Sequence, residues 1–384
     1  MNALERFHAT MSFTPVDRPL FWEFGYWAPT LRRWYGEGLP YLDGIDPELD
    51  DDGTVCAECL GVDWRNPNLD HDVNRTLGFD EPLHRVPVNN LFLPPFEPRV
   101  LAETDEWRTM VNTEGETVQV SRRNGSRHFL DAPVKTRQDY YRLREERLQV
   151  CLAERLPANW LELRAALKRR TYPLEYGGNQ GFFNSLRRLV GFRHLMLLFS
   201  DDPAFVHEMI ANVADFLIAL YDPILSEIGG DCAMISEDMC YKSGCFISPA
   251  FFRTFMLPAY RKLTGFYRDH GIQTILVDSD GDVTRLIPLL IEGGVTGLHP
   301  FEVTGKCDVV EVRKSFPHFQ ILGGIDKREL AQGRGAIDRE LERKVRFLCR
   351  TGGYIPFVDH TVPPDVSWSD FRYYRQRLAE LARG

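Results

Sequence analysis

Short apolar runs alternate with longer amphipathic segments through the last two thirds of the chain. Six of these runs, and one near the N-terminus, have the length and composition of strands; they cover residues 19–24, 172–177, 232–238, 274–279, 296–302, 319–326 and 354–360. Two of the segments between them, 248–270 and 336–353, have residues typical of helix ends: the first begins with Ser-Pro, and the second ends in glycine. Pro258 predicts a kink in the first helix.

Strands and helices that alternate at this spacing indicate parallel strands joined by right-handed crossovers. Seven strands are one short of a closed barrel, and we expect the eighth within residues 55–95, where "CLGVDW" and "GFDEPLHRV" are the candidates. Residues 99–123 are charged and alternating around a "NTEGE" turn, which predicts an antiparallel insertion at about 95–130. We therefore predict a single α/β domain over residues 1–384, a (β/α)8 TIM barrel with an N-terminal extension and this insertion.

Composition and charge narrow the classes of function. The 384 residues are 43% hydrophobic, which is enough for a large core, and no apolar run reaches the length of a membrane span. The first residues lack the features of a secretory signal, so we expect a cytoplasmic protein without a membrane partner. The net charge of −9 disfavours nucleic acid as a partner. The eight cysteines, including the pairs Cys56/Cys59 and Cys240/Cys245, are expected to be reduced thiols.

Each predicted strand ends in acidic residues. In a parallel barrel these ends meet at the mouth where substrates bind. In chain order the side chains at the ends are Glu23, Glu175, Glu237 with Asp238, Asp278 with Asp280, His299 with Glu302, Asp326, and Asp359 with His360. Capping of the following helix is an alternative role, and it is at least as good for Asp326 and Asp282. For Asp278, Glu237 and His360 we favour a functional site.

Carboxylates that surround one cavity repel one another unless a proton, a metal ion or a cationic substrate lies among them. "DSDGD" resembles a calcium loop, but Gly281 comes two places early and Leu289 stands where the bidentate Glu belongs. Zinc bound by Asp278, Glu237 and His360 is the metal site that these residue types favour. "GGNQGFF" (177–183) lies between a strand and a helix and offers backbone N–H groups to an anion.

Several segments resemble the uroporphyrinogen decarboxylase superfamily, and more narrowly its decarboxylase-like and corrinoid-linked methyltransferase members. The resemblance covers nearly the whole chain and is carried by "ERFHATMSFTPVDRPLFWEF", "ISEDMCYKSGCFISPAFFRTFMLPAYRKL", "VDSDGD", "GVTGLHPFEV", "GGIDKREL" and "GGYIPFVDHTVPPDVSWSDFRYY". It implies a (β/α)8 barrel with the active site at the C-terminal mouth. Glu23 and aromatic residues replace the family's early arginine, which leaves Arg32 and Arg33 as loose counterparts. Asp278 and Asp280 stand where the methyltransferases have a zinc-binding His and Cys.

These features lead to a first hypothesis: a methyltransferase or demethylase that moves a methyl group between a small methylated substrate and a corrinoid cofactor on a partner protein. Its catalytic residues would be Glu237, Asp238, Asp278, Asp280 and His360. The substrate-binding residues would be Glu23, Trp22, Tyr26, Trp27, Arg32, Glu175, Asn179 and His299. For the aromatic residues, Phe182 among them, the alternative is core packing. Zinc is the metal candidate, and a homodimer is a further partner to consider, since dimers are common.

Two other hypotheses stay open. One is cofactor-free decarboxylation of a porphyrinogen or another carboxylate, in which Arg32, Arg33 or Arg187 holds the substrate and Asp238 or Asp278 stabilises the protonated intermediate. An acidic pocket disfavours a substrate with many carboxylates. The other is a non-catalytic barrel whose acidic mouth holds a cation or an amine.

Overall fold

A parallel β-sheet forms the centre of the fold in the computed structural model, which describes residues 1–42, 71–122, 126–303 and 307–383. Its seven strands lie in the order β1-β6-β7-β10-β11-β12-β13. Their bounds are His84–Arg85 (β1), Leu174–Tyr176 (β6), Cys232–Ser236 (β7), Thr274–Asp278 (β10), Gly297–Phe301 (β11), Gln320–Gly323 (β12) and Tyr354–Ile355 (β13). The six later strands coincide with predicted ones and are shorter.

The expected closed barrel of eight strands is not confirmed. Residues 19–26 form no strand; Tyr26 makes an isolated parallel bridge to Val362, whose N–H donates to the carbonyl of Gly25 at 2.9 Å. The strand expected within residues 55–95 is β1, which lies in "GFDEPLHRV", whereas "CLGVDW" lies outside the described residues. The fold is therefore α/β with seven parallel strands among the described residues.

The two faces of the sheet are packed by different sets of side chains. Cys232, Met234 and Leu276 belong to a cluster with residues of the N-terminal segment such as Trp22. The residues between them in the strands belong to a second cluster, made with the surrounding helices. Successive residues of a strand point to opposite faces, and both faces are covered here, as in other parallel sheets. This alternation decides which strand-end residues face the interior.

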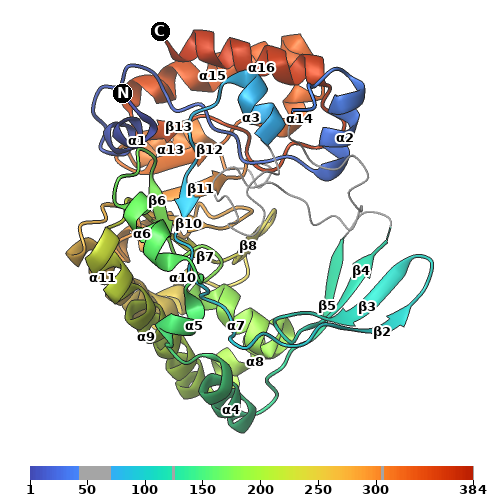
Figure 1. Cartoon of the computed structure of the whole chain (residues 1–384), viewed down its shortest axis with the longest axis vertical. Helices are drawn as coiled ribbons and strands as arrows, with labels where there is room; N and C mark the ends of the chain where they lie inside the picture. The colour runs from blue at the N-terminus through green and yellow to red at the C-terminus, as the bar shows by residue number, and fades with distance from the viewer. Residues whose placement is uncertain (43–70, 123–125, 304–306, 384) are drawn as a thin grey trace.

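Helices surround the sheet, with α15 and α16 at one end of the view and α9 and α11 at the other (Figure 1). The helices before β7 are α1 (Ala3–Met11), α2 (Ala28–Gly36), α3 (His71–Leu77), α4 (Arg137–Arg147), α5 (Leu152–Arg155), α6 (Trp160–Leu167), α7 (Phe182–Val190), α8 (Phe192–Asp201) and α9 (Pro203–Ile228). Those after it are α10 (Pro249–Phe251), α11 (Leu257–Asp269), α12 (Ile287–Glu292), α13 (Val309–Ser315), α14 (Lys327–Leu330), α15 (Arg334–Thr351) and α16 (Trp368–Ala382).

Two local features of the helices depend on sequence. A π-helical turn, η1 (Phe252–Met256), precedes α11, in which Pro258 is the second residue. Proline has no N–H for the helical ladder, so the irregular turn lies where the kink is predicted. Among the described residues, only α9 is long and apolar enough to cross a membrane. Its residues Phe205, Leu217 and Ile224 are buried in the core, which accounts for its apolar character.

The insertion is an antiparallel sheet of four strands that projects from the rest of the molecule (Figure 1). Its strands are β2 (Arg99–Glu103), β3 (Trp107–Val111), β4 (Thr117–Ser121) and β5 (Arg127–Asp131). This confirms the predicted antiparallel insertion. A second antiparallel pair, β8 (Cys240–Tyr241) with β9 (Gly244–Cys245), follows β7 and has no counterpart among the predicted elements.

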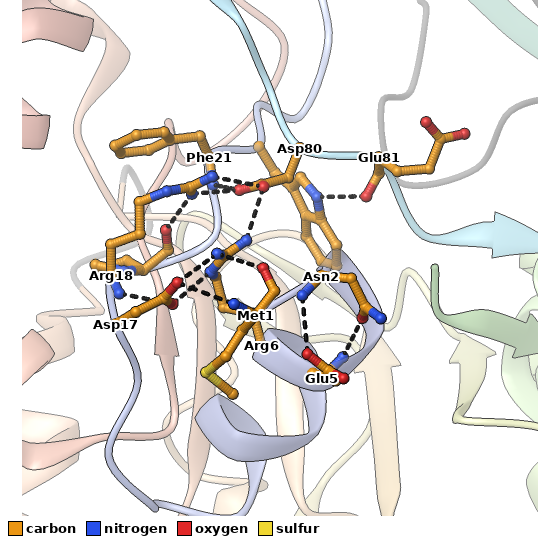
Figure 2. A network of polar contacts seen from close by, with 11 residues as sticks. Met1, Asn2, Glu5, Arg6, Asp17, Arg18, Phe21, Asp80 and Glu81 are labelled. Carbon is orange, nitrogen blue, oxygen red and sulfur yellow. Dashed lines mark hydrogen bonds and ion pairs between the residues drawn. The ribbon is translucent and has the colours of Figure 1, made fainter. Parts of the chain in front are cut away.

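A polar network attaches the N-terminal segment to the chain that leads into β1 (Figure 2). The guanidinium of Arg6, on α1, donates to Asp17 and, at 2.9 Å, to Asp80. Asp80 also accepts from Arg18 at 2.6 Å and from the backbone N–H of Phe21 at 2.8 Å. Residues 17–21 are thereby held beside the start of β1, and the following residues run along the sheet toward the site.

Candidate functional site

Asp278 and Ser236 lie at the ends of neighbouring strands. Both point to the face of the sheet that packs against the N-terminal segment, which we call the interior face. Asp278 is paired in register with Ser236, whose hydroxyl donates to its Oδ2 at 2.8 Å. Each lies two residues beyond an interior residue, Met234 in β7 and Leu276 in β10, and therefore points to the same face. The prediction that Asp278 faces the mouth agrees with this placement.

The carboxyl group of Asp280 faces the imidazole of His360, with Oδ2 and Nε2 3.7 Å apart. The Nδ1 atom of His360 accepts the N–H of Thr361 at 2.8 Å, so the ring proton is on Nε2, toward Asp280. Partial desolvation and the charges of the nearby Asp238 and Glu302 carboxylates together raise the pKa of Asp280 to about 7. The structure thus brings together two predicted catalytic residues and gives one of them a proton at neutral pH.

Glu302 and Asp359 complete this cluster of acidic side chains. Glu302 accepts the N–H of Gly281 at 2.7 Å. Asp359 is fully buried; it accepts the N–H of Lys327 at 3.2 Å, and the ammonium group of Lys327 lies 3.5 Å away. Burial raises the pKa of Asp359. Sequence reasoning missed Lys327, although its place directly after the strand-end Asp326 could have pointed to it.

The ring of Phe24 lies between two imidazoles, those of His360 and His299. The ring of Phe24 lies 4.8 Å from that of His360 and 5.4 Å from that of His299. Neither ring nitrogen of His299 has a hydrogen-bond partner among the described residues. Burial lowers the pKa of His299 to about 3, so its ring is neutral. His299 is therefore a buried, neutral imidazole, and its role in substrate binding stays a prediction.

A second group of predicted residues is centred on arginines. Asp238, whose backbone has a φ of 42°, accepts from Arg187 at 3.3 Å. Glu175 is fully buried and accepts from Arg85 at 3.3 Å, and Arg85 also donates to Asn179 at 3.3 Å. Glu175 and Asn179 thus share one cation, which sequence reasoning did not identify because β1 was only weakly predicted.

Glu237 is turned away from this site. It follows Ser236, so it points to the opposite face of the sheet, where it is buried at the start of α7. Its carboxylate accepts the N–H groups of Phe182 at 3.0 Å and Phe183 at 2.7 Å and the hydroxyl of Tyr260 at 2.7 Å. Burial raises its pKa to about 7. The backbone N–H groups of "GGNQGFF", predicted to bind an anion, therefore donate to the side chain of Glu237.

The N-terminal residues predicted to bind substrate are mostly packed in the interior. Glu23 is buried and accepts the N–H of Val358 at 2.8 Å and an N–H of Arg375 at 3.1 Å. The rings of Trp22 and Tyr26 are also buried, in contact with Phe7 and with Trp34, respectively, which favours the alternative of core packing. Trp27 is half-buried before α2, and Arg32 is exposed on that helix.

The predicted zinc ligands are not brought together. Glu237 lies on the helix side of the sheet, whereas Asp278 and His360 are on the interior side. Among the described residues no group of three or more His, Cys, Asp and Glu side chains is placed to hold a metal ion. The donor set therefore does not fit zinc. Asp326 caps α14 by accepting from the N–H of Arg328, as the alternative role requires.

The fold and this cluster define an α/β protein of enzyme type, in which acidic side chains and a histidine lie at the carboxyl edge of a parallel sheet. The family model described as uroporphyrinogen decarboxylase (URO-D) matches residues 164–380, more than half of the chain. The chain belongs to the uroporphyrinogen decarboxylase family.

A solved structure, a methyltransferase from Methanosarcina mazei, is similar in fold. It has a TM-score of 0.60 and 14% sequence identity, and the match covers 99% of each chain. At this identity the similarity shows the fold alone. No individual curated protein matches this sequence.

Proposed function

We propose that this enzyme transfers a methyl group from a small methylated substrate to a corrinoid on a partner protein, with Asp280 as the proton donor. The observation that carries the proposal is the pair of Asp280 and His360, 3.7 Å apart, in which the carboxyl pKa is about 7. A general acid works best when its pKa is near the working pH. Its proton is then both present and transferable.

The chemistry needs an acid at the leaving atom. The bond between the methyl carbon and an oxygen or nitrogen of the substrate breaks, and the electron pair stays on that atom. The corrinoid, with cobalt in its reduced Co(I) state, supplies when bound the electron pair for the new bond to the methyl carbon. Asp280 gives its proton to the leaving atom, and the N–H of His360 stabilises the carboxylate that results.

The negative charge of the acidic cluster around Asp280 favours neutral or cationic substrates. The charges of Asp238 and Glu302 act on Asp280, whereas the neighbouring cations Lys327 and Arg187 are engaged by Asp359 and Asp238. A neutral methyl ether or a cationic methylamine fits such a site better than a substrate with several carboxylates. Phe24 and His299 lie in contact behind the acidic residues, and a substrate that reached them would meet an aromatic ring and an imidazole without a described hydrogen-bond partner.

The test is an anaerobic assay with the full chain, cob(I)alamin as the methyl acceptor, and a panel of methyl ethers and methylamines. Formation of methylcobalamin is followed by absorbance. We expect product from at least one donor, and a large loss of rate in Asp280→Asn. If no donor in the panel yields methylcobalamin, the proposal of methyl transfer to a corrinoid is wrong.

Decarboxylation is the second candidate, and membership of the uroporphyrinogen decarboxylase family favours it. In that reaction Asp280 would protonate the carbon that loses carbon dioxide. Of the arginines proposed to hold carboxylates, Arg187 is engaged by Asn184 and Asp238, and Arg33 by Glu37 and the carbonyl of Pro364. Release of carbon dioxide from uroporphyrinogen would establish this reaction, and its absence would remove it.

A further inference from the structure

Cys240 and Cys245 face each other across the small hairpin of β8 and β9. Cys240 is paired with Cys245, and Tyr241 with Gly244. The N–H of Phe246 donates to the carbonyl of Met239 at 2.9 Å, which makes the next pair along a hydrogen-bonded one. Hydrogen-bonded and non-hydrogen-bonded pairs alternate in antiparallel strands, so the cysteines form a non-hydrogen-bonded pair.

This geometry is close to that of a disulfide. Residues in a non-hydrogen-bonded pair have Cα atoms about 4.5 Å apart, and disulfides span about 4.4–6.8 Å between Cα atoms. Both cysteines are free thiols, and the thiol of Cys240 donates to the sulfur of Cys245 at 2.7 Å. Little backbone movement separates the thiol pair from a bonded one.

The two thiols differ in reactivity. Cys245 is half-buried near the tip of the hairpin, and the thiol of Cys240 lowers its pKa by donating a hydrogen bond to it. Cys240 is buried, and its pKa is raised first by its bond to Cys245 and then by burial. The thiolate is the nucleophilic form, so Cys245 is the attacking residue and Cys240 the resolving one.

We propose that Cys240 and Cys245 are a modification site that forms a reversible disulfide by exchange with a low-molecular-weight disulfide. The thiolate of Cys245 attacks one sulfur of the small disulfide and releases the other half as a thiolate. Cys240 then loses its proton to that thiolate and attacks the sulfur of Cys245, which expels the second half as a thiolate; this thiolate takes from water the proton that Cys245 gave up when it ionised. The two cysteines are oxidised by two electrons, and one small disulfide is reduced to two thiols.

The hairpin touches the loop that carries Asp280. The N–H of Asp282 donates to the carbonyl of Tyr241 at 3.0 Å. Gly281 has a φ of 80°, and a Cβ there would lie 2.6 Å from the backbone of Tyr241, so only glycine permits this contact. A disulfide would therefore stiffen a segment that packs against Gly281 and Asp282, the residues directly after the proposed acid.

The experiment uses the reduced full chain, equilibrated with mixtures of reduced and oxidised glutathione. Free thiols are then blocked, and the protein is digested with trypsin. Because Lys242 lies between the two cysteines, trypsin separates them unless a disulfide joins the peptides. We expect a joined pair, with fragment spectra that place the bond at Cys240 rather than at Cys232 in the same peptide. The amount should rise with the share of oxidised glutathione and vanish on reduction.

Variants distinguish the roles of the two thiols. Cys240→Ser should lose the joined pair and accumulate a glutathione adduct on Cys245, because the resolving thiol is gone. Cys245→Ser should lose both products. Cys151→Ser, in which another half-buried thiol is removed, should behave as the parent chain. The proposal is overturned if both thiols are alkylated at every glutathione ratio, or if Cys240→Ser carries no adduct on Cys245.

Discussion

The imidazole of His360 faces the carboxyl group of Asp280, with 3.7 Å between Nε2 and Oδ2, at the edge of the sheet where β10 and β13 end. Because Nδ1 accepts a backbone N–H, the imidazole is neutral and presents its N–H to the acid. In the proposed reaction Asp280 therefore donates the proton and the N–H of His360 stabilises the resulting carboxylate, so the two residues do not form an ion pair. The side chain of Asp280 is also 44% exposed, so a proton given away can be replaced from solvent.

Asp280→Asn tests the acid directly. The amide keeps the shape of the side chain but has no proton to transfer, so we expect methyl transfer to fall by about 100- to 10,000-fold. In the parent enzyme the rate should decline as pH rises above about 7, because the carboxyl group loses its proton there. The rates are measured with a donor identified in the cobalamin assay.

A matched control is Asp222→Asn on α9, where the carboxylate pairs with His270 at 3.0 Å on the exposed side of the helix. Its rate and pH profile should equal those of the parent. If Asp280→Asn keeps the parental rate above and below pH 7, Asp280 is not the proton donor.

The strand-end residues show how far sequence reasoning reached. Six of the seven strands of the parallel sheet lie within apolar runs that predicted them. The antiparallel insertion was predicted from its alternating pattern. Which strand-end side chain faces the interior was beyond that pattern. A strand buried on both faces has no polar alternation, so nothing in "CAMISED" distinguishes the face of Ser236 from that of Glu237. A shift of one residue along the strand decides whether a side chain faces the site, as Ser236 does, or the helices, as Glu237 does.

The closed barrel is not confirmed and the predicted zinc ligands do not come together, for related reasons. Residues 19–26 have the apolar content of a strand, but the segment makes only an isolated bridge through Tyr26 to Val362. The zinc prediction treated three strand ends as equivalent, and Glu237 bonds instead to the backbone at the start of α7. Contacts such as Lys327 with Asp359 depend on loops between distant segments, which periodicity does not specify.

Glu237→Gln tests the buried cap of α7. The folded-state pKa of about 7 lies above the ordinary value of 4.5, so the folded protein holds more protons between these values. The free energy of unfolding of the parent therefore falls by about 3 kcal/mol as pH rises through this window. Gln lacks that dependence, and its amide group sets N–H donors against the N–H groups of Phe182 and Phe183, at a cost of about 1–3 kcal/mol.

The deficit of Glu237→Gln should consequently be largest near pH 5 and shrink toward pH 8. Urea unfolding of both proteins at several pH values measures it, and the difference between them cancels the other titrating groups. A deficit that grows with pH would mean that the folded state favours the charged carboxylate, contrary to the burial of Glu237.

His299→Leu separates stability from binding. The buried ring bonds to no described group, so its replacement by an apolar side chain removes two unsatisfied nitrogens. We expect the free energy of unfolding to stay within about 1 kcal/mol of the parental value or to rise. KM for the methyl donor should increase, because the polar atom that orients the substrate is lost. An unchanged KM would exclude contact between His299 and the substrate.

The network in Figure 2 gives a test of what holds the N-terminal segment in place. Asp80 has only 9% of its side chain exposed and receives bonds from Arg6 and Arg18, whereas Asp17 bonds to the same Arg6 but is 44% exposed. Removal of one partner from a buried ion pair costs about 3–5 kcal/mol, because the remaining charge is stranded. We therefore expect Asp80→Ala to lower the free energy of unfolding by about that amount and Asp17→Ala to lower it by about 1 kcal/mol or less. Urea unfolding of the two variants provides the comparison, and equal losses would show that burial of Asp80 does not set the strength of the network.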